Sequence, residues 1–530
     1  MPASLVSPRS ELAGVPFFAP RKARKTVSHV AAYAIVALFC LMFDLFLPGR
    51  AGLALSSALF LIWSIWLVNE EQKASVLALN PMVCYQAWQT ATLGVAPLYT
   101  ALNGAPGSDV LFEGGRYLAF GVVAYGHALM VAGSWALYAG MKQFQPGEAK
   151  GQTTETSSPA VAGLLIAAAV GVLFHWGNEV ITPYIGSTMV QLNLLPLAAL
   201  CMVALNPPRN LRRSGNAQFV VVLLGSLAVL LLNSRRDSKM DLILSFVPLL
   251  WLTLIRKNRT TLAFVGLALV ALYLLVIAPL VMLIRTTGVR DESGSVSTLS
   301  RGSTQGAADT LRANYSSDPI AYLQDQVDAT MSRLCDPSAA GMVVTLVQNG
   351  GFLWGQGLGY VPSSFMPRIL WPSKPFSDRG HYFTASIGGA SDASLATTST
   401  GQTAAGELYW NFGWFGVFVG MYLLGAAISG FWWGAAGADP RRGLLEMAAY
   451  SGAMLSFVTG TGATAGTAFV GAVAAGIFWR AAIFVRDRVL SDRVRNARGA
   501  SRSLQVRHTR RTTGPAGGRA HNPCETLATG

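Results

Sequence analysis

Charged side chains that could bind a phosphate or move a proton fall in three short stretches of this sequence. The first is Asn233-Ser-Arg-Arg-Asp-Ser-Lys239, in which Arg235 and Arg236 are adjacent. A guanidinium group binds phosphate through two parallel, charge-assisted hydrogen bonds, so this pair is suited to a diphosphate. Local ion pairs with Asp237 and Asp241, or contact with lipid headgroups, would explain the same residues.

The second stretch is Met366-Pro-Arg-Ile-Leu-Trp-Pro-Ser-Lys-Pro375. Three prolines restrict its backbone, so Arg368 and Lys374 are presented with little conformational entropy left to lose. On composition alone it is a rigid turn that Trp371 anchors at an interface. His381 follows, either as a proton acceptor or as a solvated loop residue.

The third stretch is Gly406-Glu-Leu-Tyr-Trp-Asn-Phe-Gly413, which combines an aromatic belt with one carboxylate. Glu407 is a candidate general base, with Asp378, Asp392 and Asp237 as weaker ones, or the structural ion-pair partner of Arg368. The five cysteines form no CxxC pattern, so we expect no metal site and no disulfide framework.

The elements that position these residues are expected to be membrane spans. The chain has 530 residues, of which 52% are hydrophobic and 12% charged, and this composition excludes a soluble enzyme. Twelve apolar runs are long enough to cross the hydrocarbon core. They lie near 28–47, 51–69, 79–100, 117–140, 159–178, 188–205, 218–233, 240–255, 261–284, 409–433, 444–460 and 462–485. The sequence therefore predicts an all-α polytopic membrane protein with about 12 transmembrane helices.

The net charge of +14 is concentrated at the two ends of the chain. Basic tails beside a membrane domain are typical of cytoplasmic termini, and nucleic-acid binding is not expected. The predicted organisation is a cytoplasmic basic tail (1–27), spans one to nine (28–284), a large outer loop with short helices (285–408), spans ten to twelve (409–485) and an Arg-rich, disordered cytoplasmic tail (486–530).

The outer loop contains its own helical signals. Asp318-Pro319 is a plausible N-cap with proline at the first helical position, and apolar residues follow at helical spacing up to Leu334. Residues 339–347 predict a second short helix that ends at Asn349-Gly350-Gly351, and Gly355-Gln-Gly-Leu-Gly359 predicts a turn rather than a nucleotide-binding loop. Among the ionisable residues of the spans only His127 is expected to be deep, which favours an enzyme acting at the outer face over a carrier with a midplane site.

The sequence resembles the bacterial O-antigen and exopolysaccharide repeat-unit polymerases of the Wzy type. The resemblance rests on Pro367-Arg368-x-x-Trp371-Pro372-x-Lys374-Pro375, on Gly406-Glu407-x-Tyr409-x-Asn411-Phe412-Gly413 and on an arginine in the preceding helix, Arg333. These motifs cover the last third of the loop and the start of the tenth span, and the remaining resemblance is one of architecture. The first 230 residues contribute little to it.

The resemblance implies a GT-C-like glycosyltransferase of the bacterial inner membrane, with its large loop in the periplasm. Such an enzyme transfers a growing glycan from undecaprenyl diphosphate to an incoming undecaprenyl-diphosphate-linked repeat unit, without a cofactor. The expected partners are that oligosaccharide, membrane lipids, and a chain-length regulator and flippase of the same pathway. Arg235 and Arg236 would hold one diphosphate, Arg333, Arg368, Lys374 and Trp371 would bind the second substrate, and Glu407 or His381 would be the base.

Three other interpretations stay open. An O-antigen ligase would use the same donor and lipid A core as acceptor, and the proline–arginine–tryptophan motif favours the polymerase over it. A polysaccharide or lipid-linked sugar transporter would need midplane charges and a visible internal repeat. A noncatalytic scaffold would tolerate every charge substitution in the outer loops.

Overall fold

The structure is a computed structural model that describes part of the chain. The described residues are 23–47, 49–74, 81–103, 110–112, 116–143, 164–166, 168–173, 195–205, 211, 215–233, 245–246, 248–249, 252, 268, 312–313, 316, 318–364, 371, 379–388, 400–436, 461–462, 464–471 and 473.

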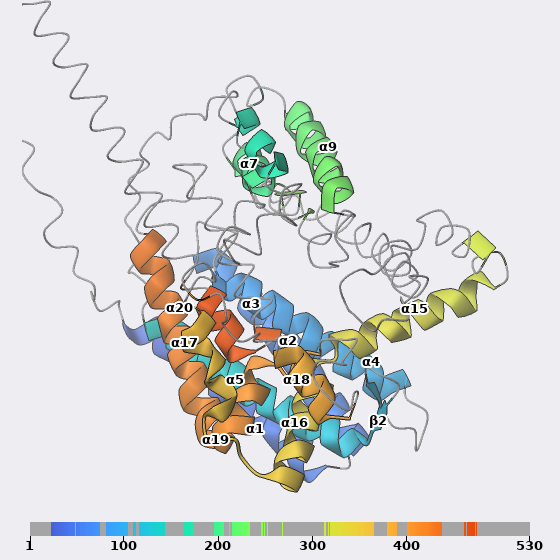
Figure 1. The fold of residues 1–530 in the computed structure, drawn as a ribbon, viewed down its shortest axis with the longest axis vertical. Coiled ribbons are helices and arrows are strands. Elements are labelled where there is room, and N and C mark those ends of the chain that lie inside the picture. Colours follow the sequence, from blue (N-terminus) through green and yellow to red (C-terminus); the bar gives the residue numbers. More distant parts are fainter. Residues whose placement is uncertain are drawn as a thin grey trace, which may run out of the picture. The chain divides into compact units, whose positions relative to one another are not determined.

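The described residues are predominantly helical (Figure 1). The strands β1 (Val110–Phe112) and β2 (Arg116–Leu118) pair as a short antiparallel ribbon, with Val110 opposite Leu118. Four helical stretches are long and apolar enough to cross a membrane, namely Ser28–Phe46, Gly49–Glu71, Phe120–Gln143 and Ala404–Gly430. The chain is therefore a helical membrane protein, as its composition predicts.

Helix α5 (Phe120–Gln143) is the centre of the packing. Helices α1 (Ala23–Phe46) and α2 (Gly49–Ala74) pack against it, and so do α16 (Asp336–Gly350) and α20 (Met421–Ala436). Its small and apolar residues are buried from Val123 to Met141, because neighbours cover it on several sides. In α1 and α2, by contrast, large apolar side chains such as Phe39 and Ile62 remain exposed, as lipid-facing residues do.

The expected third span, near 79–100, is interrupted. It consists of α3 (Pro81–Gln89), the π-helix η1 (Thr90–Val95) and α4 (Ala96–Asn103). Pro97 has no N–H, so the carbonyl of Leu93 lacks its usual α-helical partner, and the helix departs from regular geometry at this point. Arg50 of α2 completes the end of α4 by donating to the carbonyl oxygens of Ala101 (2.6 Å) and Leu102 (2.9 Å).

The predicted outer loop forms helices where its sequence indicates them. Helix α15 (Pro319–Leu334) begins after Asp318, whose side chain accepts the N–H groups of Ile320 and Ala321, so the predicted N-cap is confirmed. The second predicted helix is confirmed as α16, which begins three residues earlier than expected and ends at Gly350. The predicted turn contains the 3₁₀-helix η4 (Gln356–Leu358). Because α16 packs on α5, this segment belongs to the helical core.

Helix α19 (Ala404–Phe415) begins five residues before the expected tenth span and is broken within it. Gly413 has φ +63° and ψ −152°, which only glycine adopts readily, and the chain turns back there into the π-helix η6 (Gly416–Gly420) and α20. A Cβ at Gly420 would lie 2.7 Å from the Leu408 side chain, so the two limbs lie against each other. Residues 404–430 therefore form a helical hairpin rather than one straight helix.

The level of this hairpin along α5 follows from its contacts. Ala405, at the start of α19, faces Gly133 near the middle of α5. Trp414, just after the kink, donates from Nε1 to the hydroxyl of Tyr125 (3.2 Å). Residues between Ala405 and the kink thus lie about 8 to 20 Å from the Phe120 end of α5.

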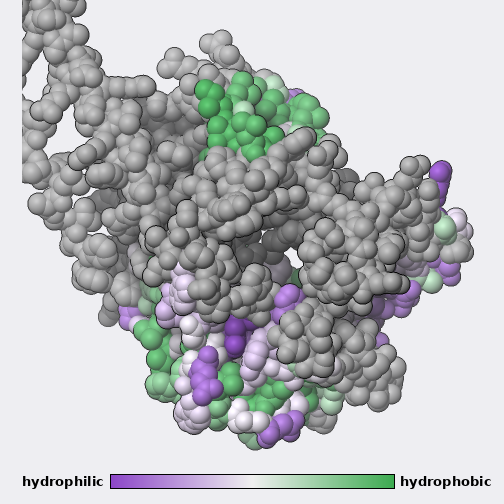
Figure 2. Space-filling model, in the orientation of Figure 1, coloured by the Kyte–Doolittle hydropathy of each residue, from purple (hydrophilic) through white to green (hydrophobic). Residues whose placement is uncertain are grey.

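Helices α7 (Leu195–Leu205) and α9 (Gly215–Asn233) pack on each other and correspond to two of the expected spans. The face of α7 and α9 that Figure 2 shows is mostly apolar, whereas the visible side chains of α15 are largely hydrophilic. Most of the expected spans near 159–178, 240–255, 261–284, 444–460 and 462–485 lies outside the described residues, so the count of twelve stays a prediction.

Candidate active site

Glu407 lies in the first turns of α19 and is wholly buried. The helix begins at Ala404 because Thr403 Oγ1 accepts the N–H of Gly406 at 3.1 Å, as an N-cap does. Thr403 has φ +64°, a conformation that a β-branched residue adopts only when its surroundings impose it. A strained residue therefore fixes the start of the helix four positions before the carboxylate.

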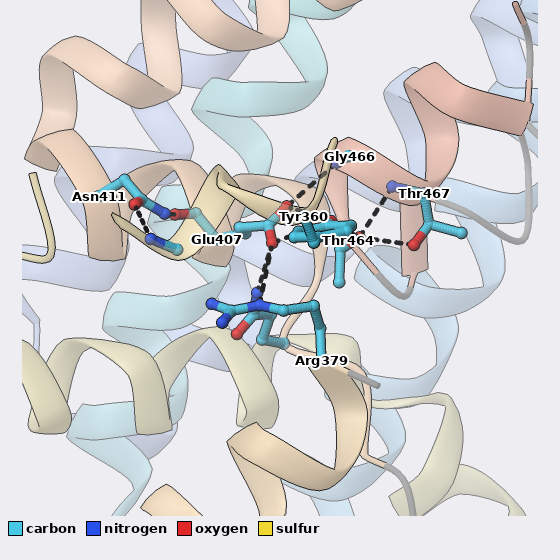
Figure 3. A network of polar contacts seen from close by, with 9 residues as sticks. Tyr360, Arg379, Glu407, Asn411, Thr464, Gly466 and Thr467 are labelled. Atoms are coloured by element: carbon cyan, nitrogen blue, oxygen red, sulfur yellow. Dashed lines mark hydrogen bonds and ion pairs between the residues drawn. The ribbon is translucent and has the colours of Figure 1, made fainter. Parts of the chain in front are cut away.

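Groups from several segments contact the Glu407 carboxylate, and Figure 3 labels Tyr360, Arg379 and Gly466 among them. Gln402 Nε2 donates to Oε1 at 2.9 Å, and the backbone N–H of Gly466 donates to Oε2 at 3.1 Å. The Tyr360 hydroxyl lies 3.2 Å from Oε1, and Arg379 Nε lies 3.8 Å from the same oxygen. The carboxylate thus joins α19, the helical residues 465–471, α17 (Tyr360–Ser364) and α18 (Arg379–Ser386).

Arg379 is the cation of this cluster, and its side chain is only 15% exposed. Its guanidinium carbon lies 4.7 Å from the ring centroid of Tyr382 and 5.7 Å from that of Tyr360, within range of cation–π attraction. Among the described residues, its buried Nε and Nη2 atoms have no hydrogen-bond partner. A guanidinium carries five N–H donors, and buried donors are normally satisfied, so this group is suited to an anionic ligand.

Residues 351–359, here called the strap, lie over the end of the first limb of α19. The N–H groups of Leu353 and Trp354 donate to the carbonyl oxygens of Trp410 (2.9 Å) and Asn411 (3.1 Å), next to the break at Gly413. The N–H of Gly357 donates to Asn411 Oδ1 at 3.0 Å, and Asn411 Nδ2 donates to the Glu407 carbonyl at 2.8 Å.

Gly357 brings the strap into contact with the arginine. A Cβ at Gly357 would lie 2.7 Å from Asn411 Nδ2 and 3.0 Å from Arg379 Nη2, so a larger residue would displace both side chains. The strap, Asn411 and Arg379 therefore form one closely packed unit.

Tyr360 supports the carboxylate as a neutral donor. Burial raises the pKa of its phenol above the usual value, and the negative charge of Glu407 raises it further. Its hydroxyl lies 2.7 Å from Thr464 Oγ1, and Thr464 in turn accepts the N–H of Thr467 at 2.9 Å as the N-cap of residues 465–471. Tyr360 is thus a protonated hydrogen-bond donor at neutral pH.

The structure describes four of the eight predicted site residues. Glu407 is buried as described above, His381 is half-buried on α18, Trp371 is exposed, and Arg333 is exposed near the end of α15. His381 lies two residues after Arg379 on the same short helix, α18. The remaining predicted residues, Arg235, Arg236, Arg368 and Lys374, lie outside the described residues.

Arg379 and Tyr360 are among the residues of the cluster that were not expected. Arg368, which the sequence offered as a structural ion-pair partner of Glu407, lies outside the described residues, and the arginine that the structure places beside Glu407 is Arg379. The available signal was its position between Asp378 and His381, two residues that were considered as proton acceptors. Tyr360 had no signal, because a tyrosine after a glycine-rich turn is ordinary loop composition.

A second buried polar cluster lies between α1, α2 and α5. His127 Nδ1 is 2.7 Å from Asp44 Oδ2, and both side chains have no exposed surface. Ser56 Oγ donates to Asp44 Oδ1, and His127 Nε2 lies 2.9 Å from the Leu93 carbonyl that Pro97 leaves without its usual partner. His127 is thus buried, with the aspartate at the end of α1 as its partner, but it is not the only buried ionisable residue, because Glu407 is unexposed as well.

The donor sets of the two clusters are not those of a metal centre. Among the described residues, no group of three or more histidine, cysteine, aspartate and glutamate side chains could hold a metal ion. Comparisons with protein-family models, with curated proteins and with solved structures found no match to this chain.

Proposed function

We propose that the protein is a membrane glycosyltransferase that polymerises lipid-linked oligosaccharide repeat units, with undecaprenyl diphosphate as the leaving group. The observation that carries this proposal is the buried guanidinium of Arg379. It has buried N–H donors without a hydrogen-bond partner among the described residues, and it belongs to the same cluster as Glu407, the carboxylate of the motif that resembles the polymerases.

The reaction requires charge stabilisation at the departing group. A hydroxyl of the incoming repeat unit attacks the anomeric carbon of the growing glycan, the bond from that carbon to the diphosphate oxygen breaks, and the hydroxyl proton passes to a base. The diphosphate leaves with its bonding electron pair, so negative charge grows on its oxygen. A preorganised cation stabilises the transition state most at that point, and Arg379 is suited to this role.

Glu407 is better placed to hold Arg379 than to accept the proton. Its carboxylate is unexposed and is contacted by Gln402, Gly466 and Tyr360 in addition to the arginine. A base must come within hydrogen-bond reach of the acceptor hydroxyl. Of the two candidates, half-buried His381 is the more accessible, so we assign the proton to His381 and the positioning of Arg379 to Glu407.

Two structural features favour a second candidate, a lipid-linked sugar transporter. The broken helix at Gly413 and the buried Asp44–His127 pair are features that transporters use at their binding sites. Counterflow of a lipid-linked sugar in proteoliposomes, without a longer glycan product, would favour this function over polymerisation.

The experiment for the main proposal compares arginine variants in cells that depend on this protein for polymer. Arg379→Gln removes the charge, and we expect polymer to fall by about a hundredfold or more, as for loss of a group that stabilises the transition-state charge. Arg379→Lys should recover only part of the activity, because lysine cannot make the planar two-point contact. Arg312→Gln, at an exposed arginine outside the cluster, is the matched control.

The same cells distinguish the two proton acceptors. His381→Gln should abolish polymer while the protein remains at its normal level in the membrane. Glu407→Gln should reduce polymer less, because an amide can still hold Arg379 through a hydrogen bond. Normal polymer length from Arg379→Gln, at normal protein level, would contradict the leaving-group role.

A further inference from the structure

Trp354 is a large aromatic residue presented outward by a strained backbone. Its φ of +50° lies in the left-handed region, which bulky side chains rarely adopt, and its side chain is 75% exposed. Neither feature contributes to folding: the conformation is unfavourable, and the exposed indole gains little from burial. Such a combination at a fixed position points to a role in binding.

The strap holds this conformation from both sides. The N–H of Trp354 donates to the Asn411 carbonyl at 3.1 Å, the preceding N–H donates to the Trp410 carbonyl, and the N–H of Gln356 returns to the Leu353 carbonyl at 3.0 Å. The ring of Phe352 stands edge-to-face to the indole at a centroid distance of 5.8 Å. The indole is therefore held in place by the strap before any ligand binds.

The same strap reaches the arginine of the candidate site. Gly357, three residues after Trp354, lies against Arg379 Nη2. The backbone from Trp354 to Gly357 can span at most about 11 Å. A glycan whose diphosphate contacts the Arg379 guanidinium can therefore place its first or second sugar ring on the Trp354 indole. Sugar rings have apolar faces of C–H groups that stack on aromatic rings, whereas their hydroxyl groups remain in water.

We propose that Trp354 stacks on a sugar ring of the lipid-linked glycan whose diphosphate contacts Arg379, an inference that rests on the proposed function. The alternative occupant of an exposed indole in a membrane protein is the lipid interface. The strap favours the sugar, because its backbone is hydrogen-bonded to α19 and its residue Gly357 contacts the buried arginine. Phe415, 71% exposed just after the kink, belongs to a helical limb without such a link.

The experiment measures how much a sugar adds to the binding of a diphosphate. The full chain in lipid nanodiscs is titrated with farnesyl diphosphate and with farnesyl diphosphate carrying glucose, galactose or N-acetylglucosamine. We expect at least one sugar to tighten binding about fivefold, as one aromatic stacking contact does. In Trp354→Gly that gain should disappear, while the affinity for farnesyl diphosphate stays unchanged and the melting temperature is no lower, because glycine adopts the left-handed conformation without strain.

The controls separate the possible failures. Trp354→Asn, which also tolerates this conformation, should behave like the glycine variant, and Phe415→Ala should keep the sugar-dependent gain. A gain retained in Trp354→Gly, no gain with any sugar in the wild type, or an equal loss in Phe415→Ala would each overturn the stacking role. If the wild type binds no farnesyl diphosphate at all, the proposed function itself fails, and the stacking inference with it.

Discussion

Replacing His127 by leucine should destabilise the protein far more than replacing its partner Asp44 by asparagine. The Leu93 carbonyl oxygen can only accept a hydrogen bond, so His127 Nε2 must carry a proton. The other ring nitrogen, Nδ1, lies 2.7 Å from the Asp44 carboxylate, so the two side chains form a buried pair.

The difference between the two variants follows from what each leaves behind. His127→Leu leaves the buried Asp44 carboxylate without its main partner, and the loss of one partner from a buried ion pair lowers the free energy of unfolding by about 3–5 kcal/mol. The variant also removes the hydrogen bond to the Leu93 carbonyl. Asp44→Asn keeps the bond to Leu93. Its amide can donate to Nδ1 and accept from Ser56, so the cost should be about 1 kcal/mol.

Thermal unfolding of the purified protein in detergent, followed by tryptophan fluorescence, measures both variants against the wild type. The double variant Asp44→Leu with His127→Leu is the control, and it should melt above His127→Leu because it leaves no unpaired charge. An equal loss of thermal stability in Asp44→Asn and His127→Leu would refute the reasoning from the partners that each variant leaves behind. A wild-type melting temperature for His127→Leu would show that the network does not support the fold.

Two further predictions concern the backbone break and a buried thiol. Gly413→Ala should lower the stability by about 1–3 kcal/mol, because alanine at φ +63° is strained, whereas Gly430→Ala, with open space around its Cβ, should be nearly neutral in the same melting assay. Burial raises the pKa of Cys335 to about 11, so alkylation of a variant that retains only this cysteine should keep rising up to that pH. A reaction rate that levels off near pH 9 would contradict this burial.

Local signals predicted the helices that have clear ends. Asp318 and the proline after it determine the start of α15 by a hydrogen bond and a fixed φ, both of which are properties of neighbouring residues. The first two spans and α5 follow from long apolar runs, which need no partner to be recognised. Features that are determined by one short stretch of sequence could therefore be predicted from the sequence alone.

The candidate site depends on contacts that no local pattern contains. Arg379 and Glu407 are 28 positions apart in the chain and meet because α18 and α19 pack together. Gly466, which follows Glu407 by 59 positions, donates its N–H to the same carboxylate. The turn at Gly413 was hidden in an apolar run whose composition fits a straight span. Long-range pairing of this kind requires the tertiary structure.

Polymerisation in a purified system tests the central proposal most directly. The protein is reconstituted in lipid and incubated with a labelled undecaprenyl-diphosphate-linked repeat unit extracted from its own cells, and the glycan products are separated on a gel. The account predicts a ladder with steps of one repeat unit for the wild type and for Arg312→Gln, and none for Arg379→Gln. Absence of the ladder in the wild type, or a full ladder from Arg379→Gln, would contradict it.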